Sequence, residues 1–266
     1  MEREKKYNQP SIVKVESLSE KLIILNLQLE EKNRQLELSE LARKNMFSNI
    51  THDLRAPIAV IHGAAERLSQ EGIGDRERLK MIRIIHSRTA TLEDLIEDMY
   101  FSALLDQPKF TLKPSRLEIA PFLEEYFISM EGSGRLDNRV TNISIPFGSA
   151  PHAMIDVKYF LRVLDNLVDN AVRHTKSGDL IEIGCCEANG SAEIFLSDSG
   201  SGIPKDDLPK IFDRTFTGIA ARTPGKSGSG LGLSISRTIV EKHGGSIHCS
   251  SVFGEGSKFT ISIPLA

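Results

Sequence analysis

The apolar residues near the start of the chain repeat at alternating spacings of three and four. Charged and amide side chains separate the members of this stripe, and Lys32 interrupts it. Such a heptad pattern lies along one side of a helix, and a single helix cannot bury it without a partner. Residues 1–40 are therefore predicted to form a coiled-coil helix, with a parallel two-stranded coil as the simplest pairing. The repeating positions are Leu18, Leu22, Leu25, Leu29 and Leu36.

Two further stripes with helical period flank EGIGD at residues 71–75, where two glycines end the first helix. Two amphipathic helices joined by a short turn form a hairpin, and one hairpin cannot cover both stripes well. Residues 41–107 are therefore predicted to form a hairpin that pairs with a second copy in a dimeric four-helix bundle. The first stripe contains Phe47, Ile50, Leu54, Ile58, Ile61, Ala65 and Leu68. The second contains Leu79, Ile82, Ile85, Thr89, Leu92, Ile96, Met99 and Ala103.

The first hairpin helix contains a histidine on the side opposite its apolar stripe. His52 lies roughly 160° from the centre of the apolar stripe on a helical wheel, so its side chain is predicted to face solvent. Asp53 flanks it, and Pro57 follows one turn later without the N–H that would bond to residue 53, which allows a bend there. A helical dimerisation module explains the stripes but gives no reason for this exposed imidazole.

Residues 106–116 contain two prolines and are expected to be a linker, and the pattern of apolar and polar residues changes after this linker. Beyond it, strand-like runs alternate with helical patterns near residues 117–130, 156–175 and 231–243. This alternation predicts an α/β sandwich at residues 115–266, with helices covering one face of a mixed sheet, and an α+β class for the whole chain. The expected strands are VTNISI (140–145), LIEIGCCE (180–187), AEIFLSD (192–198), SIHCSSV (246–252) and KFTISIPL (258–265).

Polar residues at special positions mark a candidate site in this second domain. Asn166 and Asn170 are four residues apart and share one face of a predicted helix, opposite its apolar residues. An amide oxygen is a suitable ligand for Mg²⁺, although paired polar residues are also common on solvated helix faces. Asp198 ends a predicted strand, and Gly200 and Gly202 in DSGSGI let a ligand approach the backbone closely.

The glycine-rich stretch TPGKSGSGLGLSI, residues 223–235, resembles a P-loop only superficially. A P-loop needs a further glycine where Ala220 stands, and a strand before it. What remains is a glycine series, Gly228, Gly230 and Gly232, that opens a predicted helix. The free N–H groups of a helix N-terminus bind phosphate without any P-loop ancestry. The stretch GEGSKF, residues 254–259, is expected to be a turn between two strands.

Composition excludes several classes of function. The chain is 40% hydrophobic and 26% charged with a net charge of −3, which lacks the basic excess of a nucleic-acid-binding protein. Cys185, Cys186 and Cys249 show no metal-ligand spacing, which favours reduced thiols in the cytosol. The start MEREKK lacks the apolar region of a signal peptide, and no run approaches the ~20 apolar residues of a membrane span. We therefore expect a cytoplasmic protein.

Taken in order, these motifs closely resemble the bacterial sensor histidine kinases of two-component systems. THDLRAP resembles the family's H box, NLVDNAVRHT its N box and DSGSGI its first glycine box. IFDRTF resembles the F box, SGSGLGLS the second glycine box and GEGSKF a third glycine turn. The resemblance covers residues 41–266 almost completely. It implies a HisKA-type dimerisation and phosphotransfer hairpin, followed by a Bergerat-type (GHKL) ATP-binding domain.

The resemblance implies a role for each candidate residue. His52 would accept the phosphoryl group of ATP, and Asp53 would hydrogen-bond the imidazole and act as base. Asn170 would bind Mg²⁺, Asp198 would accept a hydrogen bond from the adenine amino group, and residues 213–229 would form a lid. The full set implied at the nucleotide is Asn166, Asn170, Arg173, His174, Asp198, Gly200, Gly202, Ile203, Phe212, Phe216, Gly228, Gly230, Leu231 and Gly232.

The implied partners are a second copy of the chain and the receiver domain of a response regulator, with no nucleic acid. If the chain is a fragment, an upstream sensor domain precedes the coil, and the chain is the cytoplasmic part of a membrane-bound sensor. Two positions depart from the family pattern. Thr215 stands where the F box has an aromatic residue. Ala56 stands where the H box often has Thr or Asn, which predicts weak phosphatase activity towards the regulator.

Three rival interpretations share the ATP-binding fold. Gyrase-like and chaperone ATPases use it as an ATP-driven clamp, but they lack a histidine-bearing hairpin and need further domains. A serine kinase of the anti-sigma type would have no need of THDLRAP. A catalytically silent dimeric scaffold would not need the complete set of asparagine, aspartate and glycine residues.

Overall fold

The structure is a computed structural model that describes residues 9–146, 151–214, 216 and 230–266. The chain divides into two compact units, Met1–His52 and Asp53–Ala266. In the ranges that are described, no helix is both long enough and apolar enough to cross a membrane.

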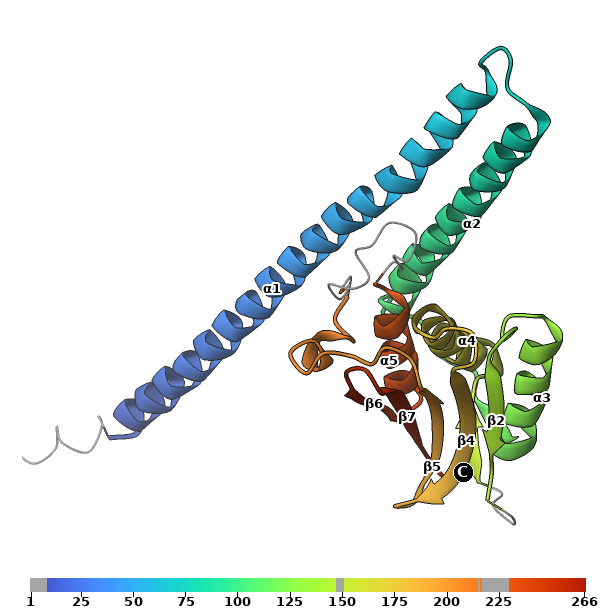
Figure 1. Cartoon of the computed structure of the whole chain (residues 1–266). Helices are drawn as coiled ribbons and strands as arrows, with labels where there is room; N and C mark the ends of the chain where they lie inside the picture. Colours follow the sequence, from blue (N-terminus) through green and yellow to red (C-terminus); the bar gives the residue numbers. More distant parts are fainter. Residues whose placement is uncertain (1–8, 147–150, 215, 217–229) are drawn as a thin grey trace, which may run out of the picture. The chain divides into compact units, whose positions relative to one another are not determined.

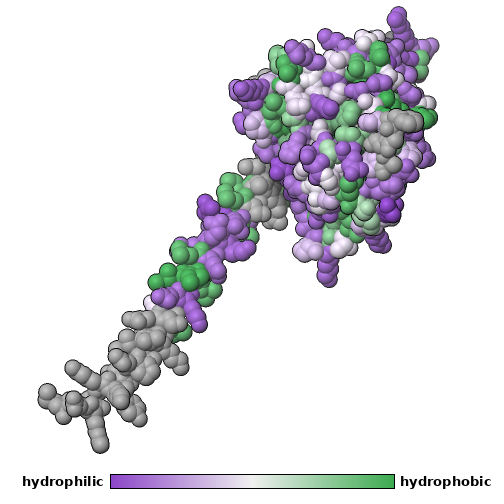
Figure 2. All heavy atoms as spheres, turned by 90° about the horizontal axis from the view of Figure 1, so that it is seen from below, coloured by the Kyte–Doolittle hydropathy of each residue, from purple (hydrophilic) through white to green (hydrophobic). Residues whose placement is uncertain are grey.

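The first unit consists of the N-terminal part of helix α1, Gln9–Leu68, which continues into the second unit. Its heptad leucines face solvent within a single chain, and Leu22 and Leu25, for example, are 55% and 61% exposed. Figure 2 shows apolar side chains interspersed with polar ones at the surface of this helix. The helical prediction is confirmed from residue 9, whereas residues 1–8 lie outside the described part of the chain. The pairing that would bury these leucines stays a prediction.

The second unit begins with a helical hairpin made by the end of α1 and by α2, Asp75–Leu105. Helix α1 ends at Leu68, four residues before the first of the two predicted glycines. Gly72 lies within the turn in a left-handed conformation (φ 79°), which glycine adopts without strain. Arg67 and Glu77 pair across this turn at 2.7 Å. The helix runs without interruption through Pro57, so the interior proline does not end it.

Burial on the hairpin shows which sides of the two helices a single chain leaves open. On α1, the predicted stripe member Ile50 is buried. Pro57 and Ala64 are buried too, one position before the predicted stripe members Ile58 and Ala65, which are exposed. On α2, Leu95 is buried, but the predicted stripe members remain largely open to solvent. Leu79, Ile82 and Ile96 are 54%, 39% and 59% exposed. The single chain therefore buries part of the predicted stripe of α1 together with neighbouring positions, and it leaves much of both stripes uncovered.

The rest of the second unit is an α/β sandwich (Figure 1). Its main sheet has five strands in the order β2-β4-β5-β7-β6. The β2–β4 pair is parallel and the other pairs are antiparallel, so the sheet is mixed as predicted. The strands are β2 (Val140–Ser144), β4 (Leu180–Ala188), β5 (Ser191–Asp198), β6 (Ser246–Val252) and β7 (Gly256–Pro264).

Three helices, α3 (Ile119–Gly132), α4 (Val157–His174) and α5 (Gly232–Lys242), pack against one face of this sheet (Figure 1). Alternate residues of β5 point towards them, because every second residue of that strand is buried. The largest fully buried side chains of the core are Phe127, Phe160 and Phe259. This one-sided cover confirms the predicted architecture.

The proline-containing segment before this domain is more ordered than a linker. Its end forms strand β1, Ser115–Glu118, which pairs antiparallel with β3, His152–Ile155, in a separate two-stranded sheet. Just before β1, the backbone N–H of Lys113 donates to Asp156 at 2.8 Å. Neither strand was predicted, because each has only four residues and shows no clear alternation of apolar and polar positions.

Two arginines of the α/β domain contact α2 within the second unit. Arg162 on α4 donates to Asp98 at 2.5 Å, and its guanidinium lies 4.1 Å from the centre of the Phe101 ring. Arg214, which follows the short 3-10 helix η1 (Leu208–Lys210), donates twice to the carboxylate of Asp106. No sequence motif indicated these pairs, because their partners are 64 and 108 residues apart.

Candidate nucleotide-binding site

The two asparagines of α4 have different environments. The amide of Asn166 donates to the backbone oxygen of Gly232 at 3.0 Å and to the hydroxyl of Ser236 at 3.2 Å. It therefore joins the middle of α4 to the first turn of α5. Asn170 is partly buried and forms no side-chain hydrogen bond with any residue in the described ranges. Its amide oxygen is a suitable ligand for Mg²⁺, which binds hard oxygen donors and keeps part of its water shell.

Asp198 ends strand β5 with its side chain inside the domain. Only 7% of the residue is exposed, and its Oδ1 accepts a hydrogen bond from the N–H of Gly200 at 2.9 Å. Burial raises the pKa of this carboxyl, and hydrogen bonds from the backbone of Gly200 and Ser257 oppose the shift. A buried carboxylate with few partners is an acceptor for an amino group that enters the domain.

The loop after Asp198 is too closely packed for side chains at its glycines. A Cβ atom at Gly200 would lie 2.4 Å from the backbone oxygen of His174, which also accepts a hydrogen bond from Ser201 N–H at 3.1 Å. Gly202 has φ 64°, and a Cβ atom there would lie 2.1 Å from the backbone oxygen of Val252. The loop is therefore held between the end of α4 and the end of β6.

The turn between β6 and β7 fixes the other side of this loop. The N–H of Gly254 donates to the oxygen of Ser201, and the N–H of Ile203 donates to the hydroxyl of Ser251, both at 2.8 Å. Ser251 in turn donates to the oxygen of Gly256 at 2.6 Å. The hairpin predicted from GEGSKF is confirmed, and it supports the Asp198 loop. Sequence reasoning missed Ser251, because the residue it supports is 48 positions away.

The start of α5 follows the predicted glycine series. Gly230 has φ 64°, Leu231 is buried and Gly232 is the first residue of the helix. The expected glycine Gly228 and most of the expected lid, including Thr215, lie outside the described residues. Just before the expected lid, the ring of Phe212 packs edge to face against the ring of Phe259, with 6.3 Å between the ring centres. Phe216 is partly buried.

The structure brings the predicted residues of α4, the Asp198 loop and α5 together. His174 contacts the Asp198 loop through its backbone, whereas Arg173 is exposed on the last turn of α4. His52 is exposed, as predicted; Ala56 is also exposed, and Asp53 is partly buried.

Comparisons with known families match both parts of the chain. Residues 42–107 match the His Kinase A (phospho-acceptor) domain. Residues 155–266 match the histidine kinase-, DNA gyrase B- and HSP90-like ATPases. The sensor protein SrrB of Staphylococcus aureus is 32% identical over 223 residues, which cover 84% of this chain and 38% of that protein. The chain thus spans well under half the length of this relative.

Solved structures share the fold. The histidine kinase ThkA, crystallised in complex with the response regulator protein TrrA, is 26% identical with a TM-score of 0.69. That match covers 89% of this chain and 65% of the ThkA chain. The histidine kinase AdeS of Acinetobacter baumannii, at 22% identity and a TM-score of 0.59, covers 80% of this chain and 98% of its own. At that identity the likeness is one of fold.

Proposed function

Because the chain belongs to the bacterial sensor histidine kinases of two-component systems, we propose that it phosphorylates its own His52 from Mg·ATP. The phosphoryl group then passes to an aspartate on the receiver domain of a response regulator. The observation that carries this proposal is the combination of the exposed His52 with the buried Asp198 in its closely packed glycine loop. A gyrase-like clamp or a serine kinase needs only the second of these features.

The nucleotide site assigns each residue a physical role. Asp198 accepts a hydrogen bond from the adenine amino group, with Gly200, Gly202 and Ile203 beside the ring. Asn170 holds Mg²⁺, which neutralises charge on the phosphate oxygens when it is bound. Asn166 acts by fixing α4 to α5, since its amide nitrogen is already engaged with that helix. The remaining contacts to phosphate and lid come from Arg173, His174, Phe212, Phe216, Gly228, Gly230, Leu231 and Gly232.

His52 supplies the nucleophile. The neutral imidazole attacks the γ-phosphorus, an N–P bond forms, the bond to the β-phosphate oxygen breaks, and ADP leaves with that electron pair. Asp53 hydrogen-bonds the ring and accepts the proton that the phosphorylated imidazole loses. Solvent exposure of His52 suits a group that must meet two partners in turn.

A pH-dependent nucleotide preference follows from the state of Asp198. Because burial raises its pKa, the carboxyl protonates at a higher pH than a free aspartate does. Protonation replaces an acceptor for the adenine amino group with a donor that suits the ring carbonyl of inosine. The ratio of ATP affinity to ITP affinity is therefore expected to fall as the pH falls through the raised pKa. Titration calorimetry with both nucleotides measures this ratio and cancels the ionisation of their phosphates. A ratio that stays constant from neutral pH down to the pKa of a free aspartate would contradict the assignment.

A second copy of the chain is the partner that the open hairpin sides require. Leu79 and Ile96 are both more than half exposed on α2, and burying two such side chains stabilises an interface by ~3 kcal/mol or more. The full chain is expected to sediment as a dimer at micromolar concentration. Replacing both residues with glutamate should shift it to monomer, whereas the same change at Arg83 and Ser87, which are exposed and lie outside the predicted stripe, should not. A wild-type chain that sediments as a monomer would refute this pairing.

Autophosphorylation is tested directly with labelled ATP. The purified chain with Mg·[γ-³²P]ATP should acquire label that is lost in acid and retained in base, as expected for phosphohistidine. Adding a panel of receiver domains should then move the label to one or a few of them. Label that survives acid, as on serine or threonine, would exclude histidine as the acceptor.

A further inference from the structure

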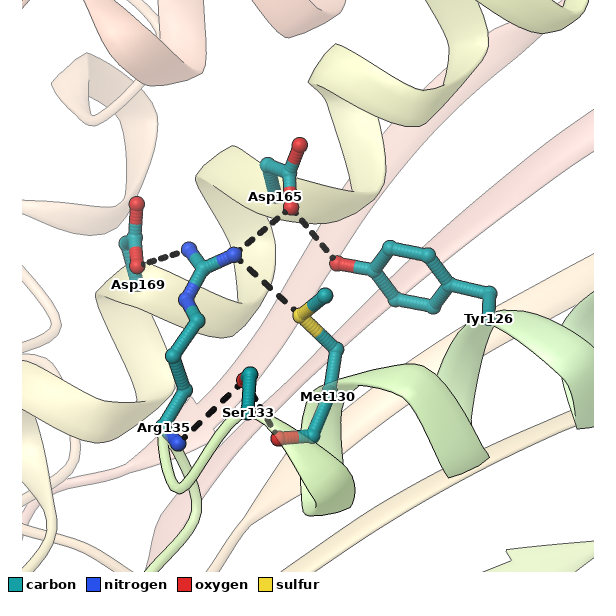
Figure 3. A network of polar contacts seen from close by, with 6 residues as sticks. All are labelled: Tyr126, Met130, Ser133, Arg135, Asp165 and Asp169. Atoms are coloured by element: carbon teal, nitrogen blue, oxygen red, sulfur yellow. Dashed lines mark hydrogen bonds and ion pairs between the residues drawn. The ribbon is translucent and has the colours of Figure 1, made fainter.

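Two aspartates on α4 lie beside the residues of the proposed nucleotide site. Asp165 and Asp169 are one turn apart, and one arginine, Arg135, binds both of them (Figure 3). Its Nη1 donates to Oδ1 of Asp165 at 2.9 Å, and its Nη2 donates to Oδ1 of Asp169 at 2.5 Å. Arg135 comes from the loop between α3 and β2, so this contact joins that loop to the middle of α4.

The surroundings of Arg135 hold its guanidinium in this position. Tyr126 donates its hydroxyl proton to the same Asp165 oxygen at 3.1 Å, and burial raises the pKa of Tyr126, so the phenol keeps that proton. The sulfur of Met130 lies 3.2 Å from Nη1 of Arg135. Figure 3 shows Met130, Asp165 and Asp169 around the guanidinium, with Tyr126 bound to Asp165. The contact is therefore built from several fixed partners.

Asp169 has a second potential partner on its own helix. Arg173 follows it by four residues, and an acidic residue four positions before a basic one is the favoured order for a helical ion pair. Yet the carboxylate of Asp169 is bound to Arg135. Arg173 is exposed and forms no hydrogen bond or ion pair within the part of the chain that the structure describes.

We infer that Arg135 is a positioning residue for ATP binding: it occupies Asp169 and so leaves Arg173 available to the phosphates. This inference rests on the proposed function, which places Arg173 at the phosphates. Without Arg135, the carboxylate of Asp169 is released and pairs with Arg173. ATP must then compete with Asp169 for the same guanidinium.

The effect is measured as the affinity of the full chain for a fluorescent trinitrophenyl-ATP in the presence of Mg²⁺. Arg173→Ala should weaken binding by about tenfold, the effect of one lost charge-assisted hydrogen bond. Arg135→Ala should weaken binding by about twofold to fivefold at low ionic strength, the range set by an exposed ion pair. Arg135→Ala combined with Arg173→Ala should bind no more weakly than Arg173→Ala alone.

Two matched double variants separate positioning from a purely structural role. Arg135→Ala with Asp169→Asn should recover wild-type affinity, because no carboxylate remains to capture Arg173. Arg135→Ala with Asp165→Asn should stay weak, since Asp165 lies two turns away from Arg173 on α4. If Arg135→Ala acted only by loosening the loop between α3 and β2, Asp169→Asn and Asp165→Asn would change the ATP affinity by the same amount.

Results other than these overturn the inference, and each one identifies which part of it is wrong. A wild-type chain that binds no nucleotide refutes the proposed function itself. Normal binding by Arg173→Ala removes Arg173 from the phosphates while leaving the proposed function standing. Weak binding by Arg173→Ala together with normal binding by Arg135→Ala, or rescue by Asp165→Asn, shows that Arg135 does not act through Asp169.

Discussion

An Asn170→Asp variant is expected to incorporate less than about one hundredth of the phosphate that the wild-type chain incorporates. The substitution keeps the size of the side chain but replaces a neutral ligand with a negative one beside the triphosphate. Loss of one preorganised electrostatic contact commonly costs 10²-fold to 10³-fold in rate. The fold should be unaffected, because the side chain of Asn170 is only partly buried and forms no hydrogen bond with the described residues.

Initial rates of ³²P incorporation at saturating ATP, together with a thermal melt, measure this prediction. Asn189→Asp is the matched control, since it adds the same charge on the exposed turn before β5, at the opposite end of that strand from Asp198. The control should incorporate phosphate at the wild-type rate. If Asn170→Asp does so too, Asn170 is not the metal ligand.

An Ala56→Thr variant is expected to remove phosphate from the regulator about 10²-fold faster than wild type. The family resemblance implies that a side chain one turn after the histidine holds the attacking water. A hydroxyl can do this, whereas the methyl group of Ala56 cannot. Loss of one positioning contact commonly costs ~10²-fold in rate. Ala56 is exposed, so threonine fits without displacing a packed neighbour. Autophosphorylation needs no such water and should stay unchanged.

The phosphatase comparison uses the phosphorylated cognate regulator with each variant in the presence of ADP. Val60→Thr provides the control, because it adds a hydroxyl to the same helix at an exposed position outside the predicted stripe. Should the wild-type chain already match Ala56→Thr, another group holds the water and the prediction is wrong.

Periodicity was a good guide to the fold where the elements are long and amphipathic. The single helix α1, the hairpin turn and the five strands of the main sheet follow from apolar spacing and glycine placement. Strands β1 and β3 were missed, because a strand of four residues is too short to show a clear alternation of apolar and polar positions. The same reasoning correctly located the buried Ile50, but it missed Pro57 and Ala64, which are buried in place of their successors Ile58 and Ala65.

The site was predictable as far as its chemistry is local in sequence. Asn170, Asp198 and the glycines belong to short motifs, and motif order identified the family. Arg135 and Ser251 could not be found in this way, because they act on residues 30 to 48 positions distant. Asn166 was expected near the nucleotide, whereas its amide nitrogen bonds to α5, a contact that only the packing of two helices creates.

The position of the phosphoryl group tests the central claim most directly. After incubation with Mg·ATP, the chain should be digested and analysed by mass spectrometry at neutral pH with fragmentation that preserves the N–P bond. One phosphate per phosphorylated chain on His52, and none in His52→Gln, is the result that the proposed function predicts. Phosphate on another residue, or equal incorporation in His52→Gln, would contradict it.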